Sequence, residues 1–283
     1  MKDSWFPGVP TRSCLTSARP ILSLAALALA LAIAGTRAGD TKPHGQLHPG
    51  HPKPIAAWSF AETDGTFVPD ASGHGYDAVI YGQPQLEPRW RGDVALAFDG
   101  SGDNSFWQGG EQNCGLGVAK RLNQAFTRLS VEAWVRKQPA WWMPIVYRDW
   151  WDDPSGFGLY MEWSSGKAYF GHYDGSGHKS AVQSETVVQD GQWHYVVGTM
   201  EPAAACCGYR YRIYVDGKLD AEQVGSWAVE EAPAEGGILK IAYPNRSRAD
   251  NPFAGALDGI AIFDTALTAA QVKARFEANR ERP

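Results

Sequence analysis

Two strand-like runs between Asp190 and Leu219 constrain the fold more than any other part of the chain. The first reads W-H-Y-V-V-G-T-M and the second Y-R-Y-R-I-Y-V, and both are rich in Tyr, Val and Ile, which favour β-strands. Asp-Gly pairs at 190–191 and 216–217 are typical of tight turns between antiparallel strands. Both runs carry large side chains on both faces, so one face is expected to join a sandwich core and the other to line a concave or partly wet surface.

A third strand, predicted at 129–137, alternates cleanly between apolar and other residues. Its two faces would carry Leu129, Val131, Ala133 and Val135 on one side and Ser130, Glu132, Trp134 and Arg136 on the other. The apolar face is predicted to point into the core, and the opposite face to belong to a shallow binding surface.

The N-terminus differs in composition from the rest of the chain. Lys2, Arg12 and Arg19 precede an apolar run at 21–33, which small residues follow. This pattern is typical of a secretory signal, so residues 1–38 are predicted to be removed and the protein to be secreted, periplasmic or held at the cell envelope. The apolar run is short for a membrane-spanning helix, so no stable membrane insertion is expected after cleavage, with an uncleaved anchor as the alternative.

Residues 39–54 contain four prolines, three glycines and three histidines, which is typical of an extended linker. One folded domain is predicted over residues 55–280. Loss of residues 1–38 removes four basic residues and one acidic residue, which changes the formal net charge from −5 to −8. A negative domain repels phosphates, so nucleic acid is not an expected partner, whereas neutral sugars remain compatible with this charge.

Three cysteines follow the predicted signal. In an oxidising compartment we expect Cys114 to form a disulfide with either Cys206 or Cys207. A redox or metal-binding role for the adjacent pair is the alternative, although neither a second Cys pair nor a nearby His supplies a zinc spacing.

The loop at 70–77 reads D-A-S-G-H-G-Y-D and is a candidate cation site. Glycine allows backbone conformations that turn carbonyl oxygens inward, and Asp70 and Asp77 would add carboxylates, which together suit calcium. An Asp side chain that bonds its own backbone and closes a hairpin explains the same residues equally well.

Residues 140–154 form an unusually tryptophan-rich loop. It contains Trp141, Trp142, Trp150 and Trp151 together with Arg148, Asp152 and Asp153. Indole rings offer a flat apolar surface to a sugar ring, and charged groups supply hydrogen bonds at its rim. These residues are therefore predicted to bind a glycan, while the alternative is that Ile145–Tyr147 is a core strand and that local packing buries one indole of each pair.

Several segments carry a family resemblance when they are read in order. They are W-S-F-A-E-T-D-G-T-F-V-P-D-A-S-G-H-G-Y-D-A, L-A-F-D-G-S-G-D, L-S-V-E-A-W-V, D-G-Q-W-H-Y-V-V-G-T, Y-V-D-G-K-L and F-A-G-A-L-D-G-I-A-I-F-D-T-A-L-T. Together they resemble the laminin-G-like domains of the concanavalin A-like lectin/glucanase superfamily. The resemblance implies an all-β jelly-roll sandwich of two antiparallel sheets. Thr268 and Gln271 separately predict a capping box for a short C-terminal helix.

The resemblance also implies ligands. Many relatives bind calcium, and many bind a glycan or an extracellular protein as ligand. Carried over onto this sequence, the metal site would use Asp70 and Asp258, with Asp77 as a further candidate. Gly259 stands where relatives commonly carry an acidic residue.

The resulting hypothesis is a secreted, non-catalytic carbohydrate-binding or adhesion module. Glycan cleavage on this fold usually requires paired carboxylates, whereas Glu132 and Glu162 each stand alone on a predicted strand. The alternatives are a polysaccharide lyase or glycoside hydrolase whose carboxylates come from separate strands, and an interaction domain for a protein ligand.

Overall fold

The described residues form a sandwich of two antiparallel β-sheets. The structure is a computed structural model that describes residues 51–89, 93–100, 115–137, 143–148, 156–162, 164–173, 179–204, 208–225, 237–242 and 253–280. All of them belong to one folded unit, Lys42–Pro283. No helix in these ranges is long and apolar enough to span a membrane.

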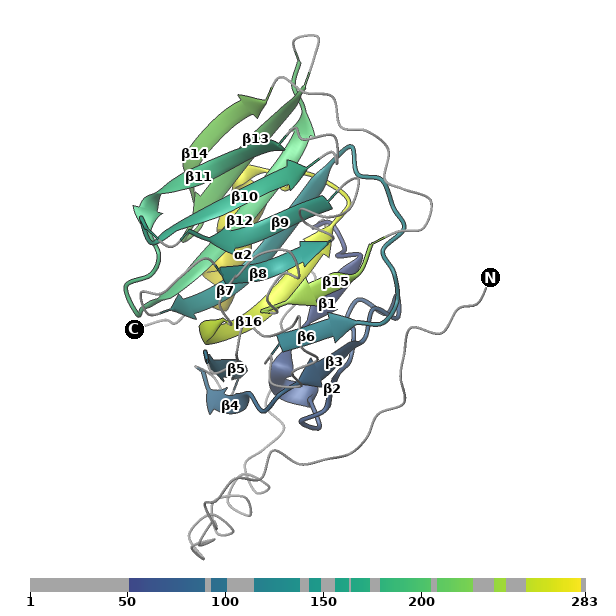
Figure 1. The fold of residues 1–283 in the computed structure, drawn as a ribbon. Coiled ribbons are helices and arrows are strands. Elements are labelled where there is room, and N and C mark those ends of the chain that lie inside the picture. The colour runs from purple at the N-terminus through teal and green to yellow at the C-terminus, as the bar shows by residue number, and fades with distance from the viewer. Residues whose placement is uncertain are drawn as a thin grey trace, which may run out of the picture. The chain divides into compact units, whose positions relative to one another are not determined.

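The strands divide between the two sheets as follows (Figure 1). Sheet A contains, in spatial order, β14 (Lys218–Gly225), β13 (Tyr209–Val215), β12 (Trp193–Pro202), β7 (Leu129–Lys137), β16 (Ala254–Phe263), β5 (Val94–Asp99) and β4 (Gln85–Pro88), and β1 (Ala56–Trp58) also pairs with β16. Sheet B contains β11 (Lys179–Val187), β10 (Lys167–Tyr173), β9 (Gly156–Met161), β8 (Met143–Arg148), β15 (Leu239–Ile241), β6 (Gly115–Val118), β3 (Ala78–Tyr81) and β2 (Phe67–Val68). The helical elements are the 3₁₀ turn η1 (Phe60–Glu62) and the helix α2 (Ala269–Asn279).

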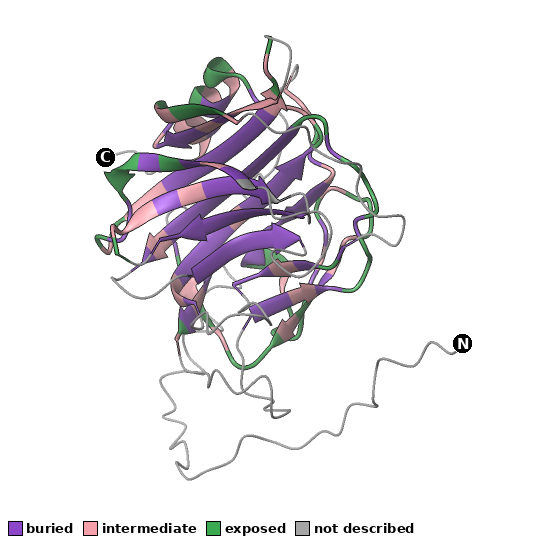
Figure 2. Ribbon diagram, turned by 45° about the horizontal axis from the view of Figure 1, so that its top comes forward, coloured by how far each residue is buried: buried purple, intermediate pink, exposed green. Residues whose placement is uncertain are grey.

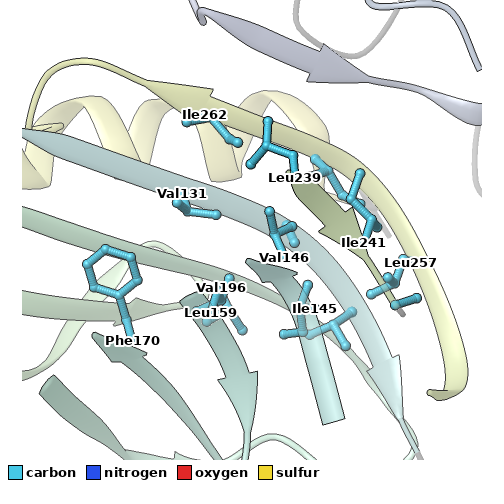
Figure 3. Close-up of a cluster of buried hydrophobic side chains, with 14 of the residues drawn as sticks. Val131, Ile145, Val146, Leu159, Phe170, Val196, Leu239, Ile241, Leu257 and Ile262 are labelled. Atoms are coloured by element: carbon cyan, nitrogen blue, oxygen red, sulfur yellow. The ribbon is translucent and has the colours of Figure 1, made fainter. Parts of the chain in front are cut away.

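The core lies between the two sheets. Alternate residues of facing strands fill it, among them Val131 and Ile262 from sheet A and Leu159 and Phe170 from sheet B (Figure 3). Gly198 on β12 allows a close approach, because a Cβ atom there would lie 2.1 Å from the Phe170 ring. Burial continues along most of the length of the central strands (Figure 2).

The structure confirms the strand pair predicted between Asp190 and Leu219. β12 and β13 are antiparallel, with Val196 opposite Val215. The next turn, Asp216-Gly217, joins β13 to β14, and both residues have positive φ angles (50° and 78°). Two consecutive positive φ angles match the twist of a tight hairpin, which explains why this position carries Asp-Gly.

The outer face of sheet A corrects one prediction. The face of β7 that carries Glu132 and Trp134 was expected to be a shallow binding surface, but both residues are buried. Helix α2 packs against this face through Val272 and Phe276, and it begins at the predicted capping box of Thr268. The prediction was wrong because a helix from the far end of the chain covers this face.

One carboxylate joins the neighbouring edges of the two sheets. Asp220 on β14 accepts hydrogen bonds from the backbone N–H groups of Glu185 (2.6 Å) and Thr186 (2.9 Å) on β11, and from the Thr186 hydroxyl (2.6 Å). An edge strand of sheet B is thus tied to an edge strand of sheet A.

Candidate functional site

The outward side chains of sheet B share one surface. Strand register places Val79 beside Gly117, Gly117 beside Lys240, and Lys240 beside Tyr147, which lies beside Gly158. Their neighbours along each strand point into the core, so this row faces away from sheet A. We define the sheet B face as Phe67, Val79, Tyr81, Gly117, Tyr147, Gly158, Tyr160, Tyr169 and Lys240.

Two glycines let tyrosine rings lie against the backbone of the sheet B face. A Cβ atom on Gly158 would lie 2.0 Å from the Tyr160 ring, and one on Gly117 would lie 3.0 Å from the Tyr81 ring. Tyr160 also contacts Tyr147, with ring centroids 5.9 Å apart. The face is therefore low in relief and is built largely from aromatic carbon.

Exposure changes along the sheet B face. Tyr147 and Tyr160 are almost fully buried, whereas Tyr81 is 45% exposed, and its neighbours Phe67 and Val79 are 40% and 38% exposed. Phe67 and Val79 are direct cross-strand partners, and Tyr81 lies on the same side of β3. The accessible aromatic surface is thus concentrated at the β2–β3 edge.

Polar groups accompany these rings. Lys240 holds its ammonium nitrogen 5.5 Å from the centre of the Tyr147 ring. Burial raises the pKa of Tyr169 to about 12, so its hydroxyl stays protonated at neutral pH and can donate as well as accept a hydrogen bond. The exposed ring of Tyr81 and the hydroxyl of Tyr169 lie five strands apart on the same face, with Lys240 between them, which suits an extended ligand with an apolar face and many hydroxyls.

Glu162 has a structural role in the β9–β10 hairpin. Its carboxylate accepts hydrogen bonds from the backbone N–H and hydroxyl groups of both Ser164 and Ser165. Burial alone would raise the pKa of Glu162, but these hydrogen bonds outweigh it and hold the pKa below its usual value. A carboxylate stabilised in its charged form is a poor general acid.

Glu132 is buried on the other sheet, beneath helix α2. It accepts hydrogen bonds from the Tyr195 hydroxyl (2.5 Å) and from Nε of Arg275 (2.7 Å), and it forms a second contact with the Arg275 guanidinium. The two glutamates therefore lie in different sheets and each is occupied by structural partners. They do not form the pair that glycosidic cleavage requires.

Comparison with known proteins agrees with this architecture. A laminin-G family profile, described as the concanavalin A-like lectin/glucanases superfamily, matches residues 108–273. The chain belongs to this superfamily. No curated protein matches the chain.

Solved structures of similar fold include a domain of an arabinanase and binding domains of a botulinum neurotoxin. Domain 4 of AbnA, a GH43 extracellular arabinanase from Geobacillus stearothermophilus solved with arabinotriose, has 17% identity and a TM-score of 0.59, covering 79% of this chain and 98% of that domain. Binding domains of botulinum neurotoxin DC solved with SialylT and with rat synaptotagmin II have 16% identity and TM-scores of 0.57 and 0.56. Each covers 80% of this chain, which spans about half of the toxin domain (51%). At these identities the similarity shows the fold.

Most of the predicted tryptophan site lies outside the described residues. The site residues outside the described part of the chain are Trp141, Trp142, Trp150, Trp151, Asp152 and Asp153. The cysteines of the predicted disulfide, Cys114, Cys206 and Cys207, also lie outside it. Arg148 is described and is 3% exposed, with Nη1 donating to the carbonyl oxygens of Gln124 (2.5 Å) and Leu122 (3.3 Å). Its guanidinium also lies over the rings of Phe126 and Phe157 (5.3 and 5.2 Å). Arg148 thus holds the preceding segment in place and is not a surface group.

Asp70 forms the centre of its loop in the way the Asx-turn alternative describes. Its carboxylate accepts hydrogen bonds from the backbone N–H groups of Ala57, Ser72, His74 and Tyr76 and from the Ser72 hydroxyl. Burial would raise the pKa of Asp70, but these bonds outweigh it and lower the pKa. Asp77 lies in the same loop and accepts the N–H of Asp70 (2.8 Å).

The other predicted metal ligand, Asp258, forms a buried ion pair with Arg89. N–H donors therefore surround Asp70 and a guanidinium contacts Asp258, whereas calcium requires oxygen atoms directed at the ion. The described residues contain no group of three or more His, Cys, Asp or Glu side chains arranged to hold a metal. Asp70, Asp77 and Asp258, as arranged, do not fit a shared calcium ion, and calcium binding by this protein stays a prediction.

The residues of the sheet B face were not predicted as a site. Local sequence carries part of the signal, since the run at 156–161 places Gly158 and Tyr160 on the same side of one strand. The rest depends on cross-strand register between Val79, Gly117 and Lys240, which are far apart in the sequence.

Proposed function

We propose that this protein is an exported, non-catalytic carbohydrate-binding module whose ligand lies along the sheet B face. The observation that carries the proposal is the exposed edge of that face, where Phe67, Val79 and Tyr81 continue a row of tyrosines. Helix α2 covers Trp134 and Tyr195 on the outer face of sheet A, and the aromatic side chains that are most exposed among the described residues, Phe67 and Tyr81, lie on sheet B.

The binding mode follows from these groups. The C–H face of a sugar ring would stack on Tyr81, whose ring lies against Gly117. Lys240 and, farther across the sheet, the phenol of Tyr169 would donate hydrogen bonds to hydroxyls of other sugar units of an oligosaccharide. The tryptophans at 141–142 and 150–151 directly precede and closely follow β8 in the sequence, and we include them in the proposed ligand surface.

Two further lines support the proposal. The arabinanase domain of the same fold was solved with arabinotriose, an oligosaccharide. The apolar run at 21–33, preceded by basic residues, supports export to a compartment where polysaccharides are found. A few stacking contacts give weak single-site binding, so effective retention would depend on multivalent display.

Substitution of the exposed ring tests the proposal. Tyr81→Ala and Trp151→Ala are expected to reduce retention on a glycan array by about tenfold each, which corresponds to about 1.4 kcal/mol, with little change in melting temperature. Leu219→Ala is a matched control, because Leu219 is similarly exposed (51%) but lies on sheet A. Unchanged retention in both aromatic variants would contradict a glycan role for this face.

A protein ligand is the second candidate, because the exposed Phe67–Val79 pair offers aliphatic and aromatic contact area. Capture of a purified extracellular protein that is lost in Phe67→Ser, yet is insensitive to competing sugars, would favour this candidate over the glycan.

A further inference from the structure

A buried cation lies within the outer face of sheet A. Arg89, which follows β4, contacts the carboxylate of Asp258 on β16, and neither side chain has any exposed surface. The Arg89 guanidinium also lies between two indoles, 4.3 Å from the centre of the Trp134 ring and 4.7 Å from that of Trp193. One positive charge is therefore enclosed by a carboxylate and two aromatic faces.

The charges around this position favour a resident cation. Burial raises the pKa of Asp258, and the attraction and hydrogen bond of Arg89 act against that rise. Burial lowers the pKa of Arg89, while Asp258 and, more weakly, Asp93 oppose that change. A buried carboxylate needs a positive partner, and a protein supplies one either as a bound ion or as a basic side chain.

A second basic side chain occupies the loop at 70–77. Lys120 donates from Nζ to the carbonyl oxygen of His74 (2.5 Å), and its ammonium lies 4.4 Å from the Tyr76 ring. A carbonyl of the glycine-containing turn, which would be a natural calcium ligand, is thus already bonded to a protein cation. The two candidate cation positions, Asp258 and the loop at 70–77, are thus each contacted by a basic side chain of the chain itself.

We propose that Arg89 is the built-in cation of this site: it neutralises Asp258 as a bound calcium ion would, so that the candidate site of Asp70, Asp77 and Asp258 neither needs calcium nor gains stability from it. Arg89 is well suited to this role because a guanidinium is always charged, hydrogen-bonds carboxylates directionally and stacks on indoles.

The first test uses the full-length protein. A ligand that binds only the folded state raises the melting temperature. Because no calcium is expected to bind at Asp70, Asp77 and Asp258, the melting temperature should be the same in excess EDTA and in excess calcium. A fall of several degrees in EDTA that calcium reverses would overturn the proposal.

The second test removes the cation. Arg89→Met leaves Asp258 buried without its guanidinium and is expected to lower the melting temperature by roughly 10 °C. Arg136→Met is the matched control, because Arg136 also lies over Trp193 (5.4 Å) and pairs with Glu87, but its side chain is 39% exposed. The control is expected to lose only about 1–2 °C.

A double variant distinguishes charge neutralisation from packing. Arg89→Met/Asp258→Asn removes both charges of the buried pair and leaves the partly buried Asp93 carboxylate without the attraction of Arg89, so the melting temperature is expected to recover part of the loss. This variant and the EDTA measurement also decide the case if Arg89→Met fails to fold. Equal losses in Arg89→Met and the Arg136→Met control, or a double variant less stable than Arg89→Met, would contradict the assigned role.

Discussion

The two outer faces of the sandwich use aromatic side chains in opposite ways. On sheet A, Trp134 is buried because Phe276 of helix α2 stacks on it, with ring centroids 5.7 Å apart and planes inclined by 24°. On sheet B, Tyr81 is 45% exposed and rests on Gly117. Aromatic content alone therefore does not identify a binding face. The decisive question is whether another element of the chain covers the rings.

The largest expected effect concerns the attachment of helix α2 to sheet A. Arg275→Met removes the guanidinium from the buried Glu132 carboxylate, which keeps its hydrogen bond from the Tyr195 hydroxyl, and should reduce the free energy of unfolding by about 3–5 kcal/mol in urea titrations. Arg280→Met is the control, since its pair with Glu277 is well exposed (45% and 43%), and it should cost less than about 1 kcal/mol. Similar losses in the two variants would show that the buried pair does not hold the helix.

An intermediate effect separates the buried and exposed tyrosines of sheet B. Gly158→Ala forces the buried Tyr160 ring to move and should cost about 1–3 kcal/mol of unfolding free energy. Gly117→Ala meets the exposed Tyr81 ring, which can shift, so it should cost less than about 1 kcal/mol but weaken glycan retention. Stability is measured by urea unfolding and binding by glycan array. Unchanged retention in Gly117→Ala would mean that the position of the Tyr81 ring against Gly117 is unimportant for glycan binding.

The smallest effect is a pH dependence confined to one end of sheet A. His194 contacts Asp216 through Nδ1 (2.9 Å) and Asp190 through Nε2 (3.2 Å), so both ring nitrogens donate when the ring is charged. The hydrogen bond to Asp216 is the main cause that raises the pKa of His194 above 6.5, with burial opposing it. The resulting stability is therefore fully present below pH 6.5 and is lost as pH rises through the raised pKa.

Melting temperatures measured across this pH window should show the loss in the wild type and not in His194→Gln, which does not titrate. Glycan retention on sheet B should change little over the same window. Parallel pH profiles in the two proteins would exclude His194 as the titrating group.

Local sequence predicted much of the fold. Alternation defined the core side of β7, Asp216-Gly217 defined a hairpin, and Thr268 with Gln271 defined the start of the helix, all of which the structure confirms. These features depend on residues close together in the chain, where the period of side-chain direction and the turn chemistry act directly.

The candidate site was much less predictable. Tyr147, Tyr160 and Tyr169 lie on consecutive strands, but Tyr81 joins their face only through the register of β3, β6 and β15, which are distant in sequence. Arg89 meets Asp258 across 169 positions. Likewise, no local pattern indicates which face of sheet A the C-terminal helix will cover. Tertiary packing decides these contacts, so short-range patterns carry little information about them.

The carboxylate of Asp220 affects how readily the molecule associates with other copies at high protein concentration. The N–H groups of Glu185 and Thr186 belong to a border strand, where free donors would invite a strand from a neighbouring molecule. Because the Asp220 carboxylate accepts hydrogen bonds from both N–H groups, this part of the edge strand offers fewer free donors for fibril-like strand pairing. A single acidic side chain thereby helps to keep separate copies apart.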